Sequence, residues 1–114
     1  MTERFGERIR RIRQERKLGL REMATKLGIS AAYLSRIETN EEKNPPAEGV
    51  IQKVADVLQD DFDELMRLAG RIPSDVTEFV KSDPGLPAFL RTAKARRLTS
   101  EDLQKMLPKR KGKS

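Results

Sequence analysis

The chain has 114 residues, which is enough for one domain or for one small domain with an appendage. Charged residues make up 37% and aromatic residues 4%, so any core is aliphatic. The sequence has no His and no Cys, which excludes disulfides, thiolate nucleophiles, and cysteine- or histidine-based metal and acid–base centres. No apolar run is long enough to span a membrane, and the lack of Cys fits a reducing compartment. We therefore expect a cytoplasmic protein with no membrane partner.

The net charge of +6 is unevenly spread. Residues 1–43 hold eleven basic and seven acidic side chains, residues 44–72 three and six, and residues 73–114 ten and five. Both ends of the chain are therefore basic and the middle is acidic. A polyanionic partner is the first binding class to consider, although a solvated surface can be equally basic.

The apolar spacing predicts five short helices between residues 1 and 70, with no strand pattern. The first follows Thr2 as N-cap. The second ends at Gly28, because glycine accepts a positive φ at little cost, and Ser30 caps a third helix that Asn40 ends in a left-handed conformation. A fourth helix follows the loop at 40–46. The apolar residues expected inside are Phe5, Ile9, Ile12, Leu20, Met23, Ala24, Leu27, Leu34, Ile37, Val50, Ile51, Val54, Val57, Leu58, Phe62, Leu65, Met66 and Leu68.

Four carboxylates lie close together at the start of the fifth helix: Asp60, Asp61, Asp63 and Glu64. A metal cluster is one interpretation of this group. We favour a helix N-terminus, with Asp61 as N-cap and Glu64 completing a capping box, because acidic side chains there also interact favourably with the helix dipole. No metal or cofactor site is expected, and no catalytic residue is identified, so an enzyme is not expected.

Residues 73–107 are predicted to form a second helical unit. One helix opens at Pro73, another follows Asp83 as N-cap with Pro84 in its first position, and the last begins with a capping box of Thr99 and Asp102. Val76, Phe79 and Val80 are expected inside the first of these helices, the second carries Leu86, Phe89 and Leu90, and the third holds Leu103, Met106 and Leu107. Residues 108–114 are expected to be a disordered basic tail, either a source of non-specific phosphate contacts or a solubilising end.

The strongest functional signal is the span Leu18–Glu38, LGLREMATKLGISAAYLSRIE. Two short helices joined by a three-residue turn that contains Gly cross steeply, as in a helix-turn-helix motif at about residues 20–38. With Leu34 and Ile37 facing the core, Ala32, Tyr33 and Arg36 share the opposite face of the third helix. Such a helix fits the DNA major groove, where an arginine can donate two hydrogen bonds to guanine.

This span resembles the Cro/CI-type (XRE, lambda-repressor-like) helix-turn-helix family over about residues 5–69. The resemblance rests on the string L-G-I-S-x-x-Y-L-S-x-I-E preceded by M-A-x-K. It implies an all-α fold, with a five-helix DNA-binding domain at 1–70 and a small C-terminal helical extension. It also implies base contacts from the third helix, loop contacts to phosphate, and an ion pair of Arg13 with Glu38 that ties two helices together. Together with Ser30 at the start of the third helix and Arg21, the residues expected to contact DNA are those that the resemblance implies: Ala31, Ala32, Tyr33, Ser35, Arg36, Lys43 and Asn44.

Three positions depart from the family pattern. Leu20 stands where the family often has a phosphate-binding Gln, so Arg21 is expected to replace that contact. Asn40 replaces the usual Gly, which is conservative because Asn tolerates a positive φ. The following loop is also longer, and its acidic pair Glu41 and Glu42 should repel DNA unless it disfavours wrong sites.

Simpler interpretations stay open for several of these side chains. Tyr33 can be a packed surface aromatic, and Arg36 can merely pair with an acidic neighbour. The basic first helix can either solvate the domain or lie near the DNA backbone.

The sequence therefore predicts a sequence-specific DNA-binding regulator, a repressor that binds an operator as a homodimer. Pairing is assigned to the second unit through Phe79, Val80, Leu86, Phe89 and Leu90, because short helices cannot bury these side chains alone; the alternative is packing of this unit on the first bundle. One competing function is an antitoxin that autoregulates its operon and neutralises a toxin through the C-terminal helices. Another is an adaptor that keeps the fold but binds protein.

Overall fold

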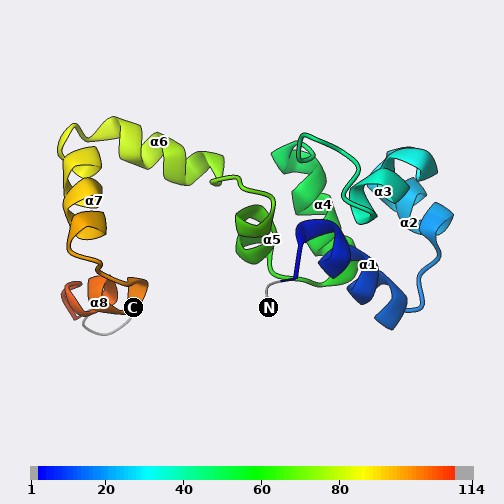
Figure 1. The fold of residues 1–114 in the computed structure, drawn as a ribbon, viewed down its shortest axis with the longest axis horizontal. Helices are drawn as coiled ribbons and strands as arrows, with labels where there is room; N and C mark the ends of the chain where they lie inside the picture. Colours follow the sequence, from blue (N-terminus) through cyan, green and yellow to red (C-terminus); the bar gives the residue numbers. More distant parts are fainter. Residues whose placement is uncertain (1–2, 110–114) are drawn as a thin grey trace. The chain divides into compact units, whose positions relative to one another are not determined.

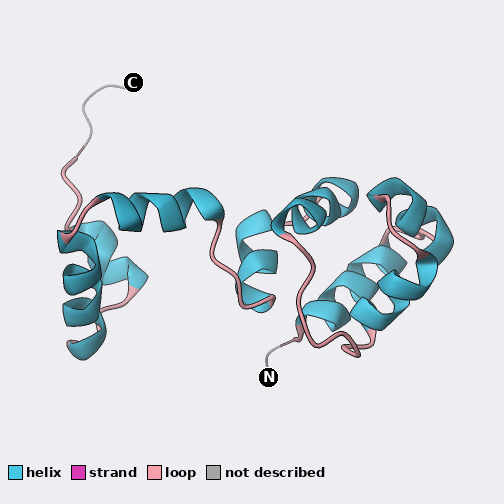
Figure 2. Cartoon of the chain, turned by 90° about the horizontal axis from the view of Figure 1, so that it is seen from above, coloured by secondary structure: helices cyan, strands magenta, loops and turns pink. Residues whose placement is uncertain are grey.

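The computed structural model describes residues 3–109, which form eight α-helices and no strand (Figures 1 and 2). The helices are α1 (Phe5–Glu15), α2 (Leu20–Leu27), α3 (Ala31–Glu38), α4 (Glu48–Leu58), α5 (Phe62–Leu68), α6 (Ser74–Ser82), α7 (Gly85–Ala95) and α8 (Ser100–Lys105). The all-α fold class is confirmed. The chain divides into two compact units, Met1–Pro73 and Ser74–Ser114. Within the described residues, no helix is long and apolar enough to cross a membrane. Most of the tail predicted at 108–114 lies outside the described range.

The first unit packs α1 to α5 around one aliphatic core. Its fully or nearly fully buried side chains come from all five helices: Ile9, Ile12, Met23, Ala24, Leu27, Leu34, Ile37, Ile51, Val54, Ala55, Leu58, Leu65 and Met66. Phe5, Leu20, Val50, Val57 and Phe62 are half-buried and pack against this core. The periodic stripes in the sequence therefore do form the interior, because each short helix supplies one apolar side to a shared centre.

Three polar or glycine positions set the ends of α2 and α3. Gly28 has φ +75° and ends α2 in the left-handed region. The Ser30 Oγ accepts a hydrogen bond of 3.0 Å from the Tyr33 N–H and so caps α3. Asn40 has φ +62° just after α3. All three roles were predicted from the sequence, and they are confirmed.

Gly6 allows a close approach between α1 and the end of α3. A Cβ at residue 6 would lie 2.1 Å from the Ile37 carbonyl oxygen, far inside van der Waals contact. The Gly6 N–H also donates a 3.3 Å hydrogen bond to the Asn40 Oδ1. Glycine is therefore required here because it has no side chain, and this packing holds the C-terminal end of α3 against the scaffold.

One predicted helix start and one predicted capping box in the first unit were wrong. The first helix begins at Phe5 with Arg4 as N-cap rather than Thr2, which lies outside the described residues. Asp61 does cap α5 by accepting the Glu64 N–H at 3.2 Å. However, no capping box forms, because the Asp61 N–H donates to the Asp60 Oδ1 at 2.8 Å and the Glu64 carboxylate pairs with Arg67.

The second unit buries very little of its apolar surface. Ala93 is its only buried residue among those described, and α6 has no buried residue. The prediction that Val76 and Phe79 lie inside α6 was wrong, because both are exposed. The capping box of Thr99 and Asp102 is confirmed, with both reciprocal hydrogen bonds present.

Two helix boundaries in this unit differ from the prediction. The Asp83 Oδ1 accepts the Gly85 N–H at 2.9 Å, but α7 starts at Gly85, so Pro84 precedes the helix rather than opening it. Helix α8 ends at Lys105. Met106 and Leu107 therefore follow α8 and are exposed, where the periodicity had placed them within it.

Candidate nucleic-acid interface

Helices α2 and α3 form a helix-turn-helix in which the second helix is anchored to the core by its inward-facing side chains. Leu34 and Ile37 are buried in the core, while the half-buried Ile29 packs under the turn. The Ser30 cap and the left-handed Gly28 set the angle at which α3 leaves the turn. The rigid scaffold therefore leaves one face of α3 directed away from the core.

The outward face of α3 consists mainly of small side chains. Ala32 and Arg36 are exposed, and Ser35 is half-buried. Ala31 and Tyr33 are also half-buried and pack partly on the core. A surface of small side chains with one projecting arginine allows the helix backbone to come near base edges.

Arg36 is held by two neighbours rather than extending freely into solvent. Its Nε donates a 2.6 Å hydrogen bond to the Glu42 Oε2, in an ion pair in which the Arg36 side chain is 47% exposed. Its Cζ lies 5.8 Å from the centroid of the Tyr33 ring, a cation–π arrangement. The acidic-neighbour alternative for Arg36 is therefore realised in this structure, and Tyr33 acts partly as its packing surface.

Arg13 and Glu38 lock α1 to the end of α3. The Arg13 Nε and Nη2 donate to the two Glu38 oxygens at 2.7 and 3.0 Å, while Nη1 donates to the Leu18 carbonyl at 2.8 Å. The Glu38 residue is only 5% exposed, and its hydrogen bonds to Arg13 raise the pKa of the guanidinium. A buried carboxylate needs such a two-pronged partner, so this pair maintains the position of α3.

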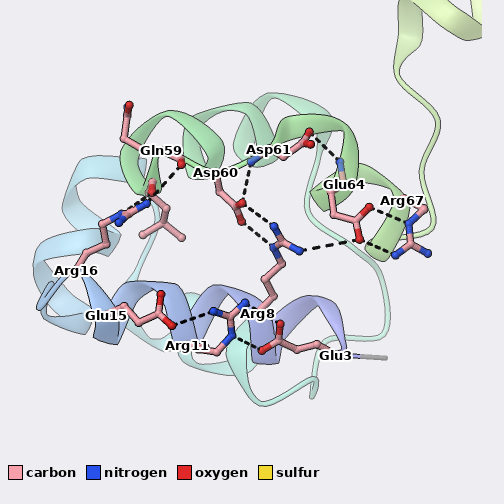
Figure 3. A network of polar contacts seen from close by, with 11 residues as sticks. Glu3, Arg8, Arg11, Glu15, Arg16, Gln59, Asp60, Asp61, Glu64 and Arg67 are labelled. Atoms are coloured by element: carbon pink, nitrogen blue, oxygen red, sulfur yellow. Dashed lines mark hydrogen bonds and ion pairs between the residues drawn. The ribbon is translucent and has the colours of Figure 1, made fainter. Parts of the chain in front are cut away.

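Two other arginines of α1, Arg8 and Arg11, are also engaged within the domain, as Figure 3 shows. Arg8 donates to both Asp60 oxygens at 2.9 and 2.8 Å, and these bonds lower the pKa of Asp60. Arg11 contacts Glu3 at 2.7 Å and Glu15 at 2.9 Å. The basic charge of α1 therefore largely serves intramolecular ion pairs.

This network also includes two of the acidic residues before and within α5, Asp60 and Glu64. Asp60 binds Arg8, and the Glu64 Oε2 lies 2.6 Å from Arg67 and 4.0 Å from Arg8 (Figure 3). Among residues 3–109, no group of three or more potential ligands is arranged to hold a metal ion. The N-terminal interpretation of these carboxylates fits the structure better than the metal interpretation.

The loop after α3 carries the two residues predicted to contact phosphate. Lys43 and Asn44 are exposed there. The loop is secured from the other side by Arg71, whose Nε donates to the Pro46 carbonyl at 2.8 Å and whose Nη2 lies 3.4 Å from the Pro45 carbonyl. Arg21 is exposed in the first turn of α2. The structure thus places every DNA-contact candidate on α2, α3, the turn between them or this loop.

Apart from the Arg13–Glu38 pair, which the family resemblance implied, sequence reasoning missed the contacts made between residues far apart in the chain. Arg8 and Asp60 are 52 residues apart, and Arg71 is 25 or 26 residues from the loop carbonyls that it contacts. No local sequence pattern predicts contacts over such separations. The Arg36–Glu42 pair spans only six residues. A chain reversal at the left-handed Asn40 was the available signal for it.

Comparison with known proteins agrees with this geometry. Residues 6–71 match the family described as helix-turn-helix domain. The chain belongs to this helix-turn-helix family. One relative is the HTH-type transcriptional repressor RghR of Bacillus subtilis (strain 168), which is 44% identical over 70 residues, covering 61% of this chain and 51% of RghR. The chain spans about half the length of the curated relatives it matches.

Two solved structures extend the helix-turn-helix comparison. The P22 c2 repressor, solved with a synthetic operator, has a TM-score of 0.51 and 28% identity over 56% of this chain and 94% of that chain. A chain of the SinR protein/SinI protein complex also has a TM-score of 0.51 and 28% identity, and covers 83% of this chain and 99% of that one. The lambda-repressor-like resemblance is thereby confirmed, and these relatives bear the names of regulators rather than enzymes.

Proposed function

We propose that this protein is a sequence-specific DNA-binding transcriptional repressor whose helix α3 enters the major groove. The observation that carries the proposal is the exposed side of α3, with Ala32 and Arg36 outward while Leu34 and Ile37 anchor the helix. The relative RghR is named a transcriptional repressor, and the P22 c2 repressor was solved with operator DNA, so both support this function.

Arg36 is assigned the main base contact. Its guanidinium can donate two hydrogen bonds to guanine O6 and N7, which provides about 1–3 kcal/mol of discrimination. Ala32 and Ala31 allow the backbone to approach the bases, and Tyr33 supports Arg36 and can contact phosphate or a thymine methyl group. These contacts would specify sequence, whereas backbone contacts would set position.

The remaining candidates are assigned to the sugar–phosphate backbone. Arg21, Lys43 and Asn44 are exposed around α3 and can reach phosphates, and the Ser30 and Ser35 hydroxyls lie at the edges of the same surface. Because each phosphate contact releases counterions, this group would govern the salt dependence of binding rather than the choice of sequence.

We further propose that the protein binds its operator as a homodimer through the second unit. Phe79 is 64% exposed and Phe89 46% exposed, and Leu90 is exposed beside them, while Val80 and Leu86 are half-buried. Exposed aromatic side chains on short helices favour association. A dimer would also place two α3 helices on half-sites about one helical turn apart.

A second candidate function is protein binding through the same helices. A chain of the SinR protein/SinI protein complex covers 83% of this chain, so the match extends beyond the 73 residues of the first unit. A toxin or an antagonist protein would then bind α6–α7. Purification of the tagged protein from its source cells separates the two, because a stoichiometric second polypeptide supports the partner function and a chain found only with itself supports the homodimer.

The experiment that tests the DNA function is selection of bound duplexes from a random pool, followed by binding of Arg36→Ala to the selected site. We expect one enriched sequence, and a loss of preference at one base pair per half-site in the variant. No enrichment, or an equal loss of affinity on selected and random duplexes, would refute the assignment of Arg36 to base recognition.

A further inference from the structure

Glu42 occupies a position that simple electrostatics does not favour. It lies beside Arg36 on the surface proposed to face DNA, where a carboxylate repels phosphates and lowers the affinity for every sequence. Yet its Oε2 accepts a 2.6 Å hydrogen bond from the Arg36 Nε. The repulsion therefore comes together with a specific contact to the one side chain assigned to base recognition.

The backbone fixes this contact. After α3, the Asn40 N–H donates to the Ile37 carbonyl at 3.1 Å and the Glu41 N–H donates to the Arg36 carbonyl at 2.8 Å. With Asn40 at φ +62°, these two bonds form a Schellman-type helix end. The chain reverses there, so Glu42 returns alongside the α3 side chain that lies six residues before it.

The contact leaves part of the Arg36 guanidinium available. Among the described residues, the hydrogen bond to Glu42 uses Nε alone, and the Tyr33 ring lies 5.8 Å from Cζ. The two terminal Nη groups form a pair of parallel donors, which is the set that guanine O6 and N7 can accept. A side chain already held in one arrangement loses less conformational entropy on binding.

We propose that Glu42 is a specificity-determining residue that positions Arg36 so that its Nη groups are presented to a guanine. This inference rests on the proposed function, in which Arg36 reads a base. Glu42 lowers the affinity for all DNA by repulsion, and this loss is offset only where the positioned Arg36 gains both hydrogen bonds to guanine. Glu42 therefore widens the gap between the correct site and all others.

The test uses the full chain with Glu42→Ala, and Glu41→Ala as the matched control. Glu41 carries the same charge and is exposed on the same loop, but among the described residues it is in no ion pair. Binding is measured on the selected operator and on a duplex in which 7-deazaguanine replaces the contacted guanine, which removes the N7 acceptor. Glu41 is exposed and the half-buried Glu42 makes only a surface ion pair, so thermal unfolding should be nearly unchanged in either variant.

We expect Glu42→Ala to reduce the preference for guanine over 7-deazaguanine about two- to tenfold, the lower part of the range typical of coupled neighbours, while affinity for random DNA rises. Glu41→Ala should raise affinity for both duplexes alike and leave the preference unchanged. In an Arg36→Ala background, Glu42→Ala should no longer alter the preference, because the side chain that it positions is gone.

Three results would overturn the inference. If Glu42→Ala changes binding to both duplexes in parallel, as Glu41→Ala does, Glu42 acts only as a charge. If Glu42→Ala increases the preference, Glu42 masks Arg36 instead of positioning it. If Arg36→Ala itself leaves the preference for guanine intact, the base-reading role under the proposed function fails as well. If the preference is lost in Arg36→Ala but kept in Glu42→Ala, only this inference fails and the proposed function stands.

Discussion

Gly6 and Gly49 lie in two helices of the first unit, but a side chain at the two positions would meet opposite surroundings. A Cβ at Gly6 would overlap the Ile37 carbonyl oxygen at 2.1 Å, while nothing lies within 4 Å of a Cβ at Gly49. Gly6→Ala should therefore destabilise the protein by about 1–3 kcal/mol, because a backbone atom must move. Gly49→Ala should stabilise it by about 0.5–1 kcal/mol through helix propensity.

Urea unfolding of both glycine variants checks this prediction. The informative quantity is the difference in unfolding free energy between the two variants, because both make the same chemical change, from glycine to alanine. Equal stabilities would mean that α1 and α3 do not approach as closely as the Gly6–Ile37 geometry indicates.

Asp60 should make a measurable contribution to the free energy of unfolding that is lost at acidic pH. Its side chain is 8% exposed, and the hydrogen bonds from Arg8 hold the pKa of this carboxyl below its ordinary value. The unfolded chain therefore takes up the proton first as the pH falls. The stabilisation from the Arg8–Asp60 pair is complete above the unfolded pKa near ~4 and is lost as the pH drops through the folded pKa.

The substitution Asp60→Asn removes the stabilisation that the Arg8–Asp60 ion pair contributes. The variant should be less stable than the parent at pH 7, and the difference should shrink as the pH falls below about 4. Chemical denaturation at a series of pH values measures it. A stability difference that stays constant down to the most acidic conditions would show that the Asp60 charge does not contribute through Arg8.

Lys43 is assigned to phosphate rather than to a base, and this gives a separate prediction. Lys43→Ala should weaken binding to all sequences alike and reduce the slope of log affinity against log salt by about one. Titrations at several salt concentrations on selected and random duplexes measure both effects. An unchanged slope would remove Lys43 from the phosphate contacts.

At the scale of whole elements, the sequence predicted best where one residue decides a local conformation. Gly28, Ser30 and Asn40 set the ends of α2 and α3, and each has the expected role. The boundaries failed where two local contacts compete. Asp60 accepts the Asp61 N–H, so Glu64 is free to pair with Arg67 and the predicted capping box does not form.

The candidate site was predictable in its helices, in the Ser30 cap and in the Arg13–Glu38 pair, but not in the other polar contacts. Periodicity places Ala32 and Arg36 opposite Leu34 and Ile37, and the structure agrees. It cannot show that Glu42 pairs with Arg36, because that depends on the direction of the chain after Asn40. Contacts such as Arg8 with Asp60 depend on tertiary packing and have no local signal at all.

Helices α6 and α7 are the elements on which the dimer prediction depends. Phe79→Asp combined with Phe89→Asp should convert a dimer to a monomer, because two charges would have to be desolvated in the contact. Glu78→Ala, also exposed on α6, is the matched control and should stay dimeric. Analytical ultracentrifugation over a range of concentrations measures the mass. A parent chain that is monomeric throughout, or a double variant that is still dimeric, would contradict the assignment.

Across the whole molecule, the two proposed functions, DNA binding and dimerisation, are assigned to different units. Among residues 3–109, every large hydrophobic side chain with high exposure except Ile72 lies in the second unit, whereas the proposed DNA contacts all lie in the first unit. A single helix-turn-helix reads one half-site, so pairing through the second unit would supply the second half and with it useful specificity.

The central claim is that the outward face of α3 reads base edges in the major groove. Methylation interference on the selected operator tests it most directly, because methylation of guanine N7 obstructs the major groove and methylation of adenine N3 obstructs the minor groove. We predict that N7 methylation of one guanine per half-site blocks the wild-type protein, and that Arg36→Ala is insensitive to methylation at that guanine. Interference confined to adenine N3, or an identical pattern for both proteins, would contradict the account.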